Sequence, residues 1–155
     1  MVIDALESIE PPYRRPIKGN YYERPLCYEF YHQFRLRIND KQIQTRFVLT
    51  GELDKRYIKI SRTPDFIFHV PGKDENFAVM EFRNARYGRR NIESALKKLE
   101  DFKKEPKLKY KIAILVIFGN KRQLKRIRSI LDGKTDEVIT IIYDVEDQEA
   151  KPLSM

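Results

Sequence analysis

The sequence has little of several residue types that carry common chemistries. Its 155 residues include a single cysteine, Cys27, so neither an intrachain disulfide nor a cysteine-based zinc site can form. The longest hydrophobic run, residues 112–118, is far shorter than the roughly 20 residues of a membrane-spanning helix. The residues near the N-terminus include acids and form no apolar signal segment. These absences favour a cytoplasmic protein without a membrane partner.

Glycine-rich signatures are also missing. The chain contains no GxxxxGK[ST], no GxGxxG and no GxSxG motif. P-loop nucleotide hydrolysis, dinucleotide binding and serine-hydrolase chemistry therefore have no support in the sequence.

Charge, by contrast, is abundant. Charged residues make up 35% of the chain, and 31 Lys and Arg against 23 Asp and Glu leave a formal net charge of +8. Such an excess favours polyanionic partners such as nucleic acid, because phosphates attract clusters of basic residues. Solubility alone explains the charge equally well, and both explanations stay open.

The length suits one domain with a substantial core and is too short for two. We predict an extended N-terminal arm over residues 1–20 that could include a short helix at Ile3–Ile9, a single domain over residues 21–146 and a C-terminal tail over residues 147–155 that frays. Hydrophobic periodicity predicts an α/β fold with a central mixed sheet flanked by helices, in the order α-β-β-β-α-β-α-β. The predicted elements are, in order, helix 22–38, strand 45–53, strands within 63–70 and 77–83, helix 91–105, strand 110–118, helix 121–131 and strand 138–145.

Two short apolar runs each carry one isolated carboxylate, Asp65 in the first and Glu81 in the second. A carboxylate among Phe, Ile, Val and Met is costly unless a partner or a metal compensates it. Glu81 and Arg83 project from the same face of a strand because they are two residues apart. Asp65 joins them only if a bulge or an odd number of loop residues places it opposite Glu81.

The pair of carboxylates has two interpretations. Asp65 and Glu81 together would suit Mg²⁺ or Mn²⁺, which favour oxygen ligands, and Arg83 could stabilise negative charge on a phosphodiester in the transition state. Alternatively, Arg83 only pairs with the two acids in a structural network. Spacing by itself does not choose between these interpretations.

Pro64-Asp65 at the start of one strand, Glu81-Phe82-Arg83 at the end of the next, and the order of helices and strands resemble the PD-(D/E)xK nuclease superfamily. The resemblance covers about two-thirds of the chain and implies a restriction-endonuclease-like core with Asp65 and Glu81 as metal ligands. Arg83 occupies the position of the family's lysine, and arginine cannot act as a base. Many members also carry a glutamate on the first helix, for which we choose Glu29, with Glu23 as the second choice.

The resemblance implies a Mg²⁺- or Mn²⁺-dependent nuclease that acts on nucleic acid, with DNA as the expected substrate. Arg86, Arg89 and Arg90 follow the motif and would guide phosphates to the site. The resemblance is also compatible with a homodimer, because cutting both strands of a duplex requires two sites. Two alternatives remain: a catalytically inactive relative that binds nucleic acid or serves in assembly, and a structural or protein-interaction domain.

Overall fold

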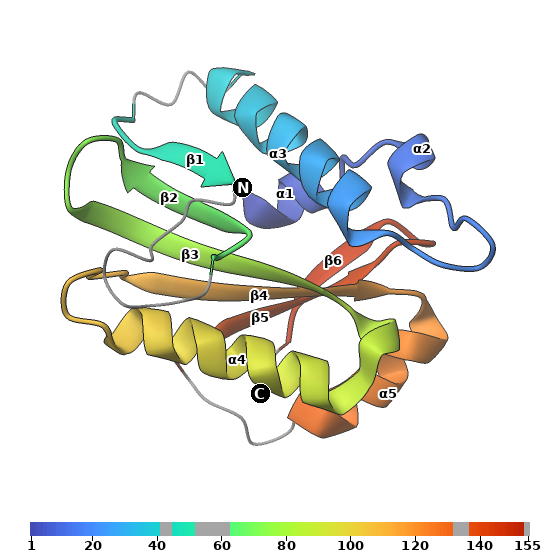
Figure 1. Cartoon of the computed structure of the whole chain (residues 1–155). Helices are drawn as coiled ribbons and strands as arrows, with labels where there is room; N and C mark the ends of the chain where they lie inside the picture. Colours follow the sequence, from blue (N-terminus) through green and yellow to red (C-terminus); the bar gives the residue numbers. More distant parts are fainter. Residues whose placement is uncertain (41–44, 52–62, 132–136, 154–155) are drawn as a thin grey trace.

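The computed structural model of the chain describes residues 1–40, 45–51, 63–131 and 137–153. It has an α/β architecture in which a six-stranded mixed sheet lies between two layers of helices (Figure 1). The helices are α1 (Val2–Leu6), α2 (Pro11–Arg14), α3 (Glu23–Asp40), the short 3₁₀ helix η2 (Ala85–Tyr87), α4 (Gly88–Lys104) and α5 (Lys121–Leu131). The strands are β1 (Val48–Gly51), β2 (Phe66–Val70), β3 (Glu75–Asn84), β4 (Ile112–Gly119), β5 (Ile139–Asp144) and β6 (Glu149–Pro152).

The strands follow one another across the sheet in sequence order, from β1 at one edge to β6 at the other. The first three strands form an antiparallel meander, β3, β4 and β5 are mutually parallel, and β6 is antiparallel to β5. Parallel neighbours need a crossover connection, which α4 supplies between β3 and β4, and α5 between β4 and β5. Both helices therefore cover one face of the sheet, and α1 and α3 cover the other (Figure 1).

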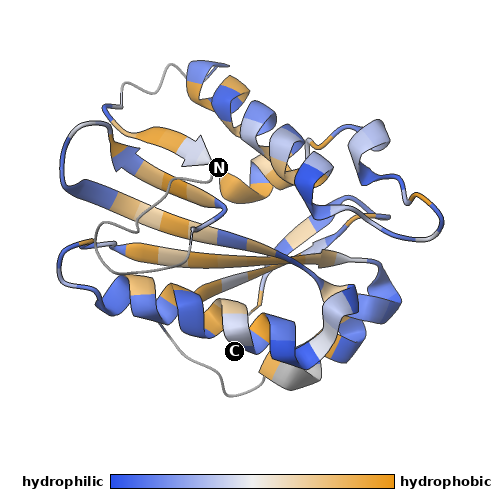
Figure 2. Ribbon diagram, in the orientation of Figure 1, coloured by the Kyte–Doolittle hydropathy of each residue, from blue (hydrophilic) through white to orange (hydrophobic). Residues whose placement is uncertain are grey.

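Alternation along the central strands separates two hydrophobic cores. Even-numbered residues such as Met80 and Phe82 pack with α1 and α3, whereas odd-numbered residues such as Val79 and Leu115 pack with α4 and α5. β4 is buried on both faces and accordingly is hydrophobic almost throughout, while the helices alternate hydrophobic and hydrophilic residues (Figure 2).

The predicted order of elements is wrong at both ends of the chain. Residues 1–20 contain α1 and α2, and Ala5, Leu6 and Ile9 are completely buried against α3 and the sheet. Residues 149–152, which the sequence assigned to a fraying tail, form β6. β6 is a polar edge strand that buries only Ala150, so hydrophobic periodicity gives no sign of it. The predicted strand over residues 45–53 appears as β1, and its last two positions lie outside the described residues.

The unequal lengths of β2 and β3 create the feature that positions the candidate site. β2 begins at Phe66, which pairs with Met80, whereas β3 continues for four more residues to Asn84. Along this last stretch β3 pairs with β4 on one side, and among the described residues no strand pairs with its other side, which we call the free edge of β3. The N-terminal part of α3 and the middle of α4 both reach this free edge of β3, as the contacts described below show.

Among the described residues, no helix is both long enough and apolar enough to cross a membrane.

Candidate functional site

The hairpin register brings the two predicted carboxylates together. Phe66 pairs with Met80, so the preceding residue, Asp65, lies beside Glu81. The register changes between Phe68 and His69, where β3 accommodates one extra residue. Such an irregularity is what the sequence analysis required if Asp65 was to share the face of Glu81.

The side chain of Asp65 also binds the backbone of β3 at its free edge. The backbone N–H of Phe82 donates a 2.7 Å hydrogen bond to Asp65 Oδ2. This N–H faces the side on which β2 has already ended, so a carboxylate takes the place of a strand partner. The bond holds Asp65 at a defined distance from the side chains of β3.

Glu81 is completely buried and is held between two cations. Lys98 Nζ on α4 contacts Glu81 Oε1, and Arg83 Nη2 lies 2.5 Å from Glu81 Oε2. Lys98 also donates a 2.7 Å hydrogen bond to the carbonyl oxygen of Thr63, and only 11% of its side chain is exposed. The ammonium therefore ties α4 both to β3 and to the chain segment that leads into Asp65.

Arg83 bridges three carboxylates that come from three different elements. Besides Glu81, its Nη1 atom lies 3.2 Å from Asp65 Oδ2 and 3.6 Å from Glu23 Oε1. The same nitrogen contacts the carbonyl oxygen of Phe82. Burial works against the guanidinium charge, but Glu81, Asp65 and Glu23 together raise the pKa of Arg83 above its ordinary value. We name Glu23, Asp65, Glu81, Arg83 and Lys98 the carboxylate cluster.

Two glutamates of the cluster, Glu23 and Glu81, hold their protons more tightly than free carboxyls do. Burial raises the pKa of Glu23 from 4.5 to about 7, with Arg83 acting in the opposite direction. Burial, followed by the charge of Asp65, also raises the pKa of Glu81, and Arg83 and Lys98 oppose this increase. Burial is therefore the main cause of both increases, and the one excess negative charge of the fully ionised cluster, three carboxylates against two cations, adds to it.

The structure selects Glu23 over Glu29 as the helix glutamate that meets the strand acids. Consecutive residues turn by about 100° around a helix, so six positions place Glu29 about 120° away from Glu23. Glu29 is buried elsewhere: it accepts a 2.7 Å hydrogen bond from Gln33 and lines a separate hollow with Tyr13. Our choice of Glu29 as a cluster residue is therefore not supported by the geometry, and the second choice, Glu23, occupies that place.

Sequence reasoning missed Lys98 altogether. A signal was present, because Lys98 lies three residues after Ala95 and four before Phe102, on a stripe of α4 that is otherwise buried. A lysine on an apolar stripe needs a nearby anion, and Glu81 is that anion.

The three predicted phosphate-guiding arginines lie beyond the end of β3. Arg86 is on η2, and Arg89 and Arg90 are in the first turn of α4, with all three side chains exposed. Arg89 lies 3.5 Å from Glu93 of the same helix. Arg89 and Lys98 are nine residues apart, or about 14 Å along the helix axis, so these arginines are neighbours of the cluster rather than members of it.

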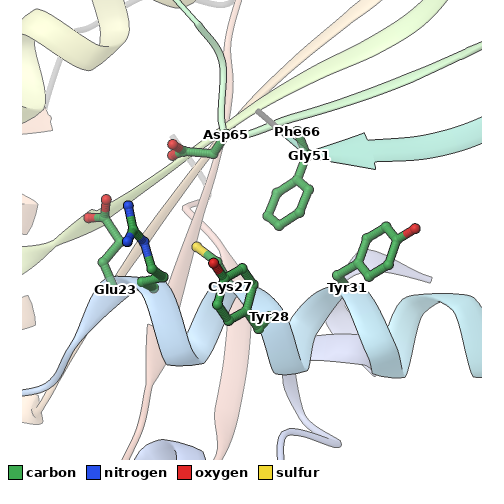
Figure 3. Close-up of a pocket in the computed structure, with 8 residues that line it drawn as sticks. Glu23, Cys27, Tyr28, Tyr31, Gly51, Asp65 and Phe66 are labelled. Atoms are coloured by element: carbon green, nitrogen blue, oxygen red, sulfur yellow. The ribbon is translucent and has the colours of Figure 1, made fainter. Parts of the chain in front are cut away.

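An open hollow of about 540 Å³ lies beside the cluster, between α3 and the ends of β1 and β2. Glu23 and Asp65 line one end of it, and the rings of Tyr28, Tyr31 and Phe66 line the other (Figure 3). The thiol of Cys27 lies between these two ends. Burial and the nearby carboxylates of Asp65 and Glu23 raise the pKa of this thiol, so Cys27 stays protonated and is no nucleophile.

Oxygen atoms dominate the donor set of the cluster, which by its chemistry suits a hard divalent cation. Over the parts of the chain that the structure describes, however, no three His, Cys, Asp or Glu side chains are arranged so that they could hold a metal ion. The guanidinium of Arg83 occupies the space among the acids, where its two terminal nitrogens contact Glu23, Asp65 and Glu81.

A scan against protein-family models found no match for the chain. Searches of curated proteins and of solved structures likewise returned no match.

Proposed function

We propose that this protein is a metal-dependent phosphodiesterase that cleaves the backbone of nucleic acid, with DNA as its substrate. The observation that carries the proposal is the meeting of Asp65 and Glu81 on the free edge of β3, next to an open hollow and with a lysine ammonium on Glu81. Acids and a lysine in this arrangement can bind a cation and steer protons beside a phosphodiester.

The element order supports the proposal as well. Helix α3, the antiparallel meander β1–β3, helix α4 and the parallel strand β4 follow the order of the restriction-endonuclease-like core that the sequence resemblance implies. On this proposal α1, α2 and β6 are additions at the ends of the chain, and the core lies between them.

Asp65 and Glu81 would hold Mg²⁺ or Mn²⁺, with Glu23 as a third oxygen donor. Such an ion, when bound, supplies charge stabilisation at the phosphate and lowers the pKa of water. Because a guanidinium already occupies the space among these acids, Arg83 has to give up some of its contacts when the ion binds. Arg83 can then neutralise charge on the phosphate, which is a role that a permanently charged group can fill.

Lys98 takes the place of the lysine that the strand lacks. The resemblance assigns a lysine to the position that Arg83 occupies. A guanidinium stays charged, so Arg83 cannot act as a general acid or base. An ammonium can do either, and Lys98 delivers one to Glu81 from α4. We therefore assign to Lys98 the task of orienting Glu81 and a water molecule, and to Arg83 that of balancing charge.

A second candidate function has an observation of its own. Arg83 contacts all three acids of the cluster, so the charges of the site are largely compensated by the protein's own cations. A member of this superfamily that no longer binds metal would keep its fold through such contacts. Its excess of basic residues could still bind nucleic acid. This catalytically inactive binding module is the alternative that an experiment must separate from the nuclease.

Cleavage assays with divalent metal separate the candidates. The protein is incubated with single-stranded and duplex DNA in Mg²⁺, Mn²⁺ or a chelator, and fragments are resolved on a gel. We expect cleavage that depends on metal and is lost in Glu81→Gln and in Lys98→Met. Salt-sensitive DNA binding without any cleavage would instead support the binding module. If the protein neither binds nor cleaves DNA, a structural domain is the remaining alternative.

The two helix glutamates provide a matched pair of variants. Glu23→Gln removes an oxygen donor that faces the cluster, so we expect the cleavage rate to fall roughly 10- to 100-fold. Glu29→Gln alters a buried acid of the same helix on a different face, and its cleavage rate should stay within about twofold of the wild type. Equal losses in both variants would contradict the assignment of Glu23.

A further inference from the structure

We infer that the exposed side of α3 next to the hollow is a binding track for single-stranded nucleic acid, which delivers an unpaired strand to the carboxylate cluster. The inference rests on the proposed function for its class of substrate and adds the strandedness. The side chains concerned lie on α3 and are not part of the carboxylate cluster.

Two arginines and two tyrosines form one stripe on this helix. Arg24, Tyr28, Tyr31 and Arg35 are spaced by four, three and four residues, which places them on a single face of an α-helix. The two arginines are exposed, 62% of Tyr28 is exposed, and Tyr31 is half-buried. The stripe extends for about 16 Å along the helix axis and has a cation at each end.

The tyrosines of the stripe are positioned as stacking surfaces. Tyr31 is nearly parallel to Phe66, with an interplanar angle of 8° and ring centroids 6.3 Å apart. The guanidinium of Arg35 lies over the Tyr31 ring at 5.8 Å from its centroid and donates a 3.2 Å hydrogen bond to the hydroxyl of the same residue. These contacts hold the Tyr31 ring in place, and the exposed ring of Tyr28 extends the aromatic surface into the hollow (Figure 3).

Two aromatic rings with a basic side chain at each end match the chemistry of an unpaired strand. Its bases stack on the aromatic rings, and its phosphates pair with the arginines beyond them. In a duplex the faces of the bases are covered by their neighbours, so they cannot lie against rings that line a hollow. The same hollow ends at Glu23 and Asp65, so a strand that follows the tyrosines brings a phosphodiester to the cluster.

Binding measured without cleavage tests the inference directly. Fluorescently labelled oligothymidylate and a DNA hairpin duplex with the same number of phosphates are titrated with the protein in a chelator, and anisotropy gives the dissociation constants. We expect roughly tenfold tighter binding of the single strand. An oligouridylate probe shows whether RNA uses the same track, since stacking is common to both nucleic acids.

Substitutions assign the binding to the stripe. Tyr28→Ala should weaken binding of oligothymidylate roughly tenfold, because one base loses the ring on which it stacks. Tyr28→Phe keeps the ring and should bind like the wild type. Ile139→Ala removes a side chain that is 48% exposed on β5 and lines neither of the two hollows that Tyr28 borders, so this variant should have no effect.

The outcomes distinguish this inference from the proposed function. Equal affinity for duplex and single strand, or wild-type affinity in Tyr28→Ala, would overturn the track even if the protein cleaves DNA. Binding of single strands that depends on Tyr28 would support the track even if no metal induces cleavage, and the inactive binding module would then be the function.

Discussion

Lys98 on α4 and Glu81 on β3 form an ion pair that is almost closed to solvent, with 11% of the lysine side chain and none of the glutamate side chain exposed. The pair fixes the register of a helix against the central strand at the point where the candidate site begins. It also compensates a carboxylate that the surrounding hydrophobic core would otherwise disfavour.

Removal of this lysine should destabilise the protein. Lys98→Met leaves Glu81 with Arg83 as its remaining cation, so we expect the free energy of unfolding to fall by about 3 kcal/mol. Urea denaturation followed by circular dichroism measures the change. Lys97→Met is the matched control, because the adjacent lysine is exposed. A loss of the same size in both variants would mean that the ion pair does not contribute to stability.

The raised pKa of Glu23 predicts a pH-dependent contribution to stability. The native state keeps the proton of this carboxyl up to about pH 7, whereas the unfolded chain releases it near the ordinary value of 4.5. The contribution of the group is therefore complete below pH 4.5 and is lost as the pH rises through 7. Glu23→Gln lacks this titration, so its stability relative to the wild type should increase over that range.

Thermal or urea unfolding at several pH values measures this difference between variant and wild type. Ile17→Ala, at an exposed position without a titratable group, serves as the control and should show no such trend. A constant difference between Glu23→Gln and the wild type across the range would mean that Glu23 titrates alike in the folded and the unfolded chain.

Arg83 and a divalent cation should compete for the same carboxylates. We expect Arg83→Met to be less stable than the wild type in a chelator, because three acids then lie close together with only Lys98 to compensate them. Added Mn²⁺ should restore stability, by about 2.7 kcal/mol when its concentration exceeds the dissociation constant a hundredfold.

The increase of the melting temperature with Mn²⁺ measures this recovery. Adding Glu81→Gln to Arg83→Met should reduce it, since one of the oxygen ligands is then lost. A melting temperature of Arg83→Met that does not respond to Mn²⁺ or Mg²⁺ would argue against a metal site among these acids.

The N-terminal residues should contribute to the stability of the domain. Leu6 of α1 is completely buried in the hydrophobic core that α1 and α3 form with the sheet. Leu6→Ala should therefore lower the free energy of unfolding by about 3 kcal/mol. Ile17 lies in the same N-terminal stretch but is 60% exposed, and Ile17→Ala should change stability by no more than about 0.5 kcal/mol. Urea denaturation of both variants tests whether α1 is an integral part of the core.

Much of the domain follows from patterns within single elements. The four-residue spacing of apolar residues on α3, the amphipathic pattern of α4 and the continuous apolar run of β4 are local signals, because periodicity alone decides which face each element buries. Strand parity likewise placed Glu81 and Arg83 on one face before any tertiary contact was considered. The polar strand β6 carried no such signal, since an edge strand buries little.

The site depends on distances that no local pattern contains. The α/β class, the two strand acids and the need for Asp65 to be in register with Glu81 could be predicted from the sequence. The contacts between elements show, in addition, that a bulge meets this requirement, that Glu23 rather than Glu29 faces the acids, and that Lys98 reaches Glu81. No local pattern contains these contacts, because charge compensation acts over a few ångströms between elements far apart in the chain, and packing sets those distances.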